Sequence, residues 1–153
     1  RNLLTQAAET TMKIHQLSVF LENKPGALAV PVKLLAEAGL NLDTLALADS
    51  SEYGILRLIM REWEQAKTVL QAAGCTVNVV ELVAVDVPDA PGGLASVLDA
   101  IAGSGVNIEY MYGFPSHADG QAALVLRFDQ PDRALEALGA AGIGVLSLEE
   151  FVG

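Results

Sequence analysis

Two turns that combine proline with glycine carry the residues best suited to bind a small ligand. Asn23 lies two residues before Pro25-Gly26, and Asp89 lies two residues before Pro91-Gly92. Glycine has no Cβ atom, so a ligand can approach its backbone closely. If each turn opens a helix, its free N–H groups and the positive end of the helix dipole suit a carboxylate. Asn and Asp oxygens can also accept a hydrogen bond from an ammonium group. The pattern therefore indicates non-covalent recognition of a small zwitterion.

The same polar residues have a structural explanation that stays open. Asn and Asp are favoured as helix caps, so Asn23 and Asp89 fit helix entry equally well. Asn41 and Asn107 each follow a helix-ending glycine and are expected to open a strand. Their residue type suits either turn formation or contact with a ligand.

Three aromatic residues form the third candidate feature. Tyr110, Tyr112 and Phe114 alternate along a predicted strand, so they should share one face of the sheet. Two interpretations remain open for this face. It either points into the hydrophobic core or forms an apolar wall for a ligand.

The sequence shows no catalytic constellation. No glycine-rich loop has phosphate- or dinucleotide-binding spacing, and no serine lies in a nucleophile-elbow pattern. The single cysteine, Cys75, is expected to be a small buried hydrophobe between a helix and a strand. His15, in or beside a strand, and His117, in a loop, do not have metal-ligand spacing. We therefore expect no enzyme activity, no cofactor and no metal.

An internal repeat positions these residues. Pro25 and Pro91 are 66 residues apart, and the same spacing relates Asn41 to Asn107. Further along, residues 70–74 match residues 138–142 at a spacing of 68. The second copy therefore carries two extra residues, which fall between Asn107 and Leu124 in the stretch around residues 113–120.

Each copy predicts the order strand, helix, strand, strand, helix, strand, which is the split βαβ arrangement. Proline suits the first turn of the first helix, and Gly39 is expected to end that helix as a left-handed cap. A hairpin turn is expected at residues 49–52. In the first copy we expect strands at 17–21, 41–48, 55–60 and 75–80, and helices from 25 to 39 and at 62–73. In the second copy we expect strands at 81–87, 107–114, 122–129 and 144–151, and helices at 92–103 and 131–141.

Composition excludes several classes of protein. Hydrophobic residues make up 52% of the chain, which argues against disorder. The formal net charge of −10 argues against nucleic-acid binding, because phosphate backbones would be repelled. There is no membrane-spanning apolar run and no signal-peptide pattern, so we expect a cytoplasmic protein without a membrane partner. Residues 1–12 are expected to be a leader or a vector-derived segment outside the fold.

The doubled Asn/Asp-x-Pro-Gly-x-Leu motif, with Gly-hydrophobic-Asn following each first helix, resembles the ACT domain. Two copies in so short a chain resemble the stand-alone tandem ACT proteins of bacteria, and residues 17–28 also resemble the opening of acetolactate synthase regulatory subunits. The resemblance covers about residues 14–150. It implies an α+β fold of two ferredoxin-like modules packed side by side, with antiparallel sheets and helices on one face. The first ACT domain would span residues 13–80 and the second residues 81–153.

The resemblance also implies a function. In ACT proteins that bind effectors, an amino acid lies between modules and contacts the strand-to-helix loop of one and the second-strand start of the other. The resemblance implies a homodimer that senses a free amino acid and modulates amino-acid metabolism, with a metabolic enzyme as a further partner. The alternative is an interaction subunit that docks onto such an enzyme without a ligand. The positions implicated are Asn23, Lys24, Pro25, Gly26, Ala27, Leu28, Asn41 and Leu42 in the first copy, and Asp89, Pro91, Gly92, Asn107, Ile108 and Tyr110 in the second.

The resemblance makes the two copies unequal. Asp89 stands where several effector-binding members have Asn, and an acid there would repel a ligand carboxylate. The first copy is therefore the better candidate site.

Overall fold

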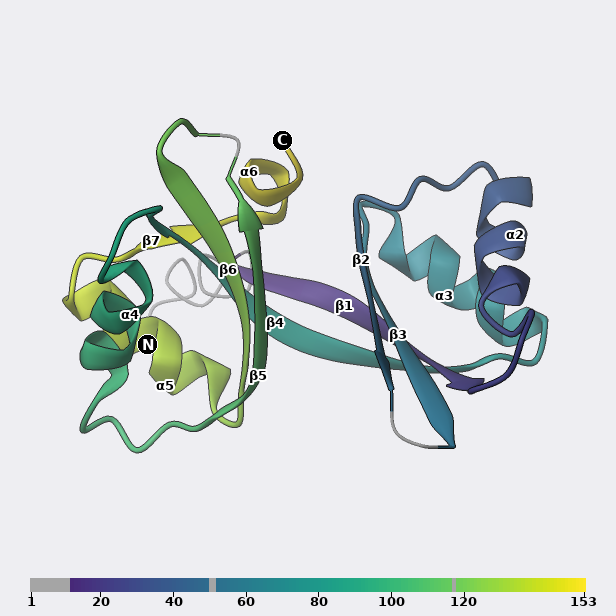
Figure 1. The fold of residues 1–153 in the computed structure, drawn as a ribbon, viewed down its shortest axis with the longest axis horizontal. Coiled ribbons are helices and arrows are strands. Elements are labelled where there is room, and N and C mark those ends of the chain that lie inside the picture. The colour runs from purple at the N-terminus through teal and green to yellow at the C-terminus, as the bar shows by residue number, and fades with distance from the viewer. Residues whose placement is uncertain (1–11, 50–51, 117) are drawn as a thin grey trace, which may run out of the picture. The chain divides into compact units, whose positions relative to one another are not determined.

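The computed structural model describes residues 12–49, 52–116 and 118–153. The expected segment at residues 1–11, the middle of the expected turn at 49–52, and His117 lie outside this part of the chain. No helix in the described part is both long and apolar enough to cross a membrane. The elements, in chain order, are β1 (Lys13–Glu22), α2 (Ala29–Glu37), β2 (Thr44–Asp49), β3 (Tyr53–Ile59), α3 (Trp63–Ala72), β4 (Thr76–Pro88), α4 (Gly93–Ile101), β5 (Ile108–Pro115), β6 (Gln121–Phe128), α5 (Pro131–Ala140), β7 (Gly144–Leu146) and α6 (Leu148–Val152) (Figure 1).

The chain forms two compact units. The first-half unit consists of residues 15–80, and the second-half unit contains residues 81–153 together with the start of β1. In the first-half unit the strand order is β2-β3-β1-β4, and β3 pairs antiparallel with both β1 and β2. In the second-half unit β6 pairs antiparallel with β4 and β5, and β7 pairs antiparallel with β4. Each unit therefore has the predicted ferredoxin-like topology.

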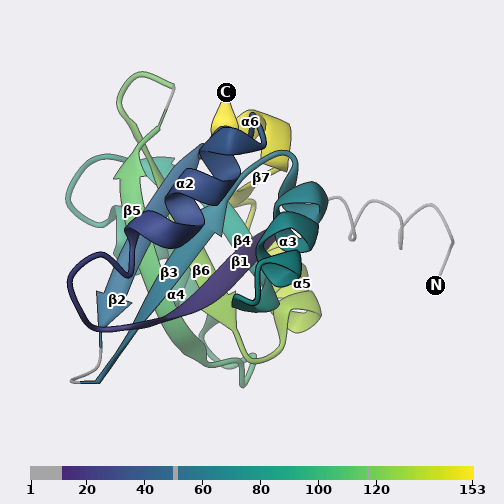
Figure 2. The ribbon, with the colours of Figure 1, turned by 90° about the vertical axis from the view of Figure 1, so that its right-hand side faces the viewer.

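In each unit two helices cover one face of the sheet. Figure 1 shows α4 and α5 on one side of the second-half sheet, and Figure 2 shows α2 and α3 lying over the first-half sheet. Every second residue of β1 and β3 faces these helices, as strand geometry requires. The fully buried residues of the first-half core include Leu17, Val19, Leu35, Leu56, Leu58 and Leu70. Those of the second-half core include Val83, Val85, Val97, Leu126, Ala134 and Leu138.

The start of β1 belongs to the second-half unit through ion pairs. The Lys13 ammonium lies 2.7 Å from Asp132 at the beginning of α5 and 3.1 Å from Glu81 on β4. The hydrogen bond to Asp132, with help from Glu81, raises the Lys13 pKa above its ordinary value of 10.5. Lys13 therefore ties β1 to two elements of the later half.

Left-handed glycines end α2, α3 and α5 with the same pair of hydrogen bonds. Gly39, with φ of 74°, follows α2, where its N–H donates to the Ala36 carbonyl at 3.0 Å. The next N–H, of Leu40, donates to the Leu35 carbonyl at 2.9 Å, which completes a Schellman motif. The same pair of hydrogen bonds follows α3 at Gly74 and α5 at Gly142. The predicted left-handed cap at Gly39 is confirmed.

The predicted last strand at residues 144–151 is wrong in its second half. Strand β7 ends at Leu146, and Ser147 begins α6. The Ser147 hydroxyl accepts a hydrogen bond from the Glu150 N–H, while the Glu150 carboxylate accepts one from the Ser147 N–H, both at 3.2 Å. This is a capping box, and Ser-x-x-Glu before a helix is its sequence signature.

The glycine caps generate a stability prediction. Gly39→Ala should lower the free energy of unfolding by about 1 kcal/mol, because an L-residue is strained at positive φ. Crowding adds nothing, since a Cβ at this position would meet no atom within 4 Å. Urea denaturation followed by circular dichroism measures the difference.

The matched control is Gly139→Ala, inside α5, where a Cβ would also meet nothing within 4 Å. Because its φ is not positive, this substitution should stabilise the protein by roughly 0.5–1 kcal/mol. Equal effects of the two substitutions would contradict the assigned role of Gly39.

Candidate ligand-binding site

The first candidate site is the exposed loop from Asn23 to Leu28, between β1 and α2. The Asn23 N–H donates to the Glu52 carbonyl at 3.1 Å, which fixes the loop next to β3. Gly26 has φ of 83°, so the turn itself needs glycine. Helix α2 starts at Ala29, so Pro25 precedes the helix and does not lie in its first turn as predicted.

The loop between β4 and α4 repeats this construction. The Asp89 N–H donates to the Gly120 carbonyl at 2.9 Å, which is the equivalent of the Asn23–Glu52 bond. Gly92 is the N-cap residue of α4, with φ of 93°. Gly93 was not among the predicted residues, yet a Cβ there would collide with the Pro88 carbonyl oxygen. In the sequence, the adjacent glycines Gly92 and Gly93 could have indicated that the backbone comes this close.

The helix-capping interpretation of Asn23 and Asp89 is wrong. No side-chain hydrogen bond caps the N-terminus of either α2 or α4. Among the backbone hydrogen bonds of the described turns, loops and helix caps, none is donated by Gly26 or Leu28, nor by the equivalent Gly92 or Leu94. Each loop therefore presents N–H groups near a helix start, which is where an anion is stabilised.

Lys24 adds a positive charge to the first loop. Its ammonium lies 2.7 Å from the Glu22 carboxylate, and both side chains are largely exposed. This hydrogen bond holds the Glu22 pKa below its ordinary value of 4.5. A ligand carboxylate approaching Lys24 would compete with Glu22. Ala27 is half-buried, whereas Leu28 is 39% exposed.

The two strand-entry asparagines are exposed, whereas the apolar residues that follow them are partly buried. Asn41 lies in the connection from α2, three residues before β2 begins at Thr44 and not inside the strand as predicted; Leu42 packs against the first-half core. Asn107 immediately precedes β5, where its N–H donates to the Asp129 carboxylate at 2.8 Å. Ile108 packs against the second-half core.

Within one unit, the loop and the strand-entry Asn lie at opposite ends of the sheet. In the first half, Glu22 before the loop pairs with Tyr53, whereas Thr44 after Asn41 pairs with Ile59. Tyr53 and Ile59 are six positions apart along β3, which corresponds to about 20 Å of strand. In the second half, Pro88 pairs with Gln121 and Ile108 with Phe128. A site that uses both features must therefore combine two modules.

The aromatic residues of β5 share one face, but it is not the core-facing one. Tyr110, Tyr112 and Phe114 pair with Arg127, Val125 and Ala123, whereas Met111 pairs with the core residue Leu126. A register shift between Ile108 and Tyr110, at Glu109, determines which residues of β5 lie on which face of the sheet. The interpretation as a core-facing stripe is wrong, because the stripe lies on the face opposite the helices.

Tyr110 also has charged neighbours. The Arg127 guanidinium carbon lies 5.8 Å from the centre of the Tyr110 ring, and Arg127 Nε lies 3.0 Å from the Glu109 carboxylate. Tyr110 therefore lies beside a neutralised ion pair. Across the described ranges, no group of three or more His, Cys, Asp or Glu residues could hold a metal ion.

Comparison with known families decides the membership of this chain. A family model described as an ACT domain pair matches residues 12–147. The chain belongs to the ACT domain family. It is a tandem pair of ACT domains, a regulatory type of module.

Solved structures agree with this assignment. Protein BT0572 from Bacteroides thetaiotaomicron is 35% identical, with a TM-score of 0.84; the match covers 92% of this chain and 96% of that one. The ligand-free regulatory subunit of aspartate kinase from Thermus thermophilus shares the fold at 18% identity and a TM-score of 0.57, covering 84% of this chain and 92% of that one. A comparison with curated protein sequences found no match.

Proposed function

We propose that this ACT domain pair is a non-enzymatic regulatory protein that senses a free amino acid at its two strand-to-helix loops. The observation that carries the proposal is a set of N–H groups on exposed residues that donate no turn or cap hydrogen bond, at Gly26 and Leu28 before α2 and at Gly92 and Leu94 at the start of α4. They would bind the amino acid's carboxylate. The likeness to a regulatory subunit of aspartate kinase supports a role in controlling amino-acid metabolism.

The two loops differ in the charge they offer. In the first loop, Asn23 is neutral and can both donate to a carboxylate and accept from an ammonium. In the second, Asp89 is exposed and can only accept when ionised, so it weakens carboxylate binding. We expect the first loop to bind more tightly.

A reciprocal exchange of these residues tests the site. In a thermal-shift screen of the twenty amino acids, a ligand at 100 times its dissociation constant stabilises the protein by about 2.7 kcal/mol. Asn23→Asp should remove most of that shift, whereas Asp89→Asn should preserve or increase it. An unchanged shift in Asn23→Asp would exclude Asn23 from the site.

The alternative is an interaction subunit that docks onto a metabolic enzyme without a ligand. A blank screen with amino acids and related metabolites, together with a stoichiometric copurifying enzyme, would favour that alternative. A ligand whose effect depends on Asn23 would favour sensing.

A homodimer would supply the second module that the site requires. Strand β2 is the edge of the first-half sheet, and its pairing with β3 runs without a register shift from Thr44 to Asp49. Leu45 and Leu47 on this edge are 56% and 54% exposed. Strand β5, an edge of the second-half sheet, is interrupted by the irregularity at Glu109 and ends at Pro115, and both features hinder pairing. Unprotected apolar edges favour strand pairing.

Antiparallel pairing of β2 with β2 of a second copy explains why the dimer would matter. Centred on Ala46, such pairing places Leu45 of one copy opposite Leu47 of the other. It also brings the β2 start of one copy, with Asn41, to the sheet end that carries the Asn23 loop of the other. We therefore propose that each first-half site is shared between two copies.

The dimer has its own test. Sedimentation equilibrium should give a dimer for the unchanged protein and a monomer for Leu47→Lys, because a lysine there would place a charge opposite the apolar Leu45 of the other copy. Leu98→Lys, at an α4 position that is 43% exposed, is the matched control and should remain dimeric. A monomeric unchanged protein, or a dimeric Leu47→Lys, would contradict the proposed interface.

A further inference from the structure

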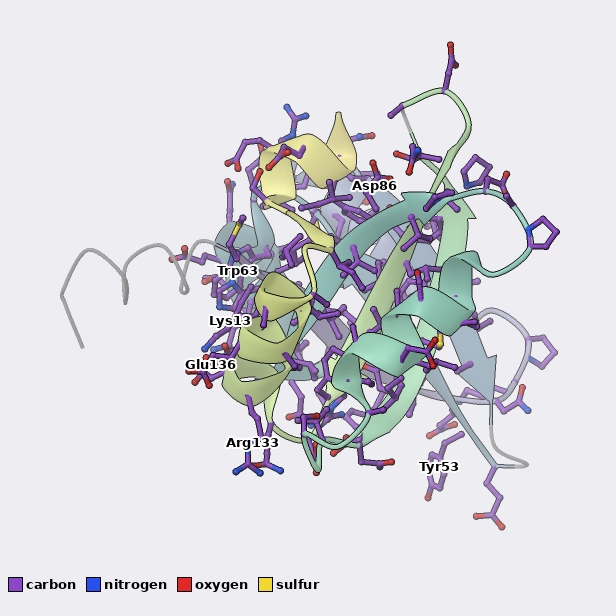
Figure 3. The ribbon with its side chains drawn as sticks, turned by 90° about the vertical axis from the view of Figure 1, so that its left-hand side faces the viewer. Lys13, Tyr53, Trp63, Asp86, Arg133 and Glu136 are labelled. Carbon is purple, nitrogen blue, oxygen red and sulfur yellow. The ribbon has the colours of Figure 1, made fainter. Side chains whose placement is uncertain are left out.

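We propose that the second-half unit has an additional site, at Asp86, for the ammonium group of a small amine with an apolar body. Asp86 lies on β4 and is half-buried. Its Oδ1 atom is shielded from solvent and has no hydrogen-bond partner. Shielding a carboxylate oxygen without a donor is unfavourable, so this position calls for a complementary cation or donor. Figure 3 shows Asp86 close to α6.

The strand registers give Asp86 small cross-strand neighbours. It pairs with Ala123 on β6 and with Gly144 on β7, so both cross-strand neighbours have minimal side chains. Side chains of directly paired residues share one face of the sheet. This is the face opposite the helices, because the core residues Val85 and Val87 alternate with Asp86 along β4. Because Asp86 as a whole keeps part of its surface exposed, an ammonium group would reach the carboxylate from that face.

Aromatic rings border the same row. Phe114 on β5 pairs with Ala123 on β6, and Ala123 pairs in turn with Asp86 on β4. The Phe114 ring centre is 5.5 Å from that of Phe151 on α6 and 5.7 Å from that of Tyr112. Aromatic faces attract organic cations and also bury apolar groups. The row thus combines one anionic oxygen with an apolar aromatic border.

The cations of this unit for which the structure gives a contact are held elsewhere. Lys13 is bonded to Glu81 and Asp132, and Arg127 is bonded to Glu109 beside Tyr110. A guanidinium nitrogen of Arg133 lies 3.6 Å from where a Cβ of Gly105 would be, which is in the connection after α4. The positive partner of Asp86 is therefore expected to come from a ligand.

This site has no counterpart in the first half. The residue 66 positions before Asp86 is Phe20, which is 41% exposed and carries no charge. The site is also separate from the loop at Asp89 that we propose for amino acids. The two proposals can therefore fail independently.

Isothermal titration with matched amines and alcohols tests the proposal. The probes are benzylamine and n-butylamine, with benzyl alcohol and n-butanol as neutral counterparts. The amines should bind the full chain at least about tenfold more tightly than the alcohols, because a hydrogen bond between charged groups is worth more than a neutral one. Asp86→Asn should abolish this preference.

Glu149→Gln is the matched control, because it removes one exposed charge from α6 and leaves Asp86 unchanged. It should keep the amine preference. If Asp86→Asn does not fold, equal binding of amines and alcohols by the unchanged protein still overturns the proposal. Absence of amine binding, equal binding of the alcohols, or full binding by a folded Asp86→Asn would overturn the proposal.

Discussion

The pairing of β3 between β1 and β2 is the constraint on which the candidate site depends. Because both pairings are antiparallel, β1 and β2 run in the same direction, and α2 must return along the sheet between them. The loop at the end of β1 and the entry to β2 consequently lie at opposite ends of one sheet. No single module can close a ligand between Asn23 and its own Asn41. A ligand that contacts both, as we propose, therefore needs a second module.

The repeat made most of this architecture predictable. Matched Pro-Gly turns and helix-ending glycines fixed the order of the elements in both halves, and Gly39 has the left-handed conformation that was predicted. The two extra residues of the second half lie in the connection between β5 and β6. Residues of β5 follow their counterparts in β2 by 66 positions, whereas residues of β6 follow their counterparts in β3 by 68. These repeated prolines and glycines predict structure reliably, because each is required by the backbone conformation of the turn in which it lies.

Features set by packing were harder to predict. Alternation showed that Tyr110, Tyr112 and Phe114 share a face, but period two cannot say which face the helices cover. The irregularity at Glu109 has no distinctive sequence signal. By contrast, the Ser147 capping box was legible, and the apolar residues after it were misread as a strand because short apolar runs fit either structure. The sequence also did not reveal that α2 and α4 have no side-chain cap, because Asn23 and Asp89 are residue types that commonly cap helices.

The halves share a backbone plan and differ in the chemistry placed on it. Equivalent positions carry Asn23 and Asp89, and Leu47 on the exposed edge corresponds to Gly113 on the protected one. A duplicated module can keep its turns, because these depend on glycine and backbone hydrogen bonds, while its side chains diverge. We therefore expect one half to provide the tighter ligand site.

The central claim is that the loop N–H groups near α2 receive the carboxylate of an amino acid. The most direct measurement is the set of backbone amide shifts of the full chain, recorded by NMR during titration with each amino acid. The account predicts that one of them causes saturable shifts at Gly26 and Leu28, together with Asn41. Saturable shifts confined to other parts of the chain, with Gly26 and Leu28 unmoved, would contradict it.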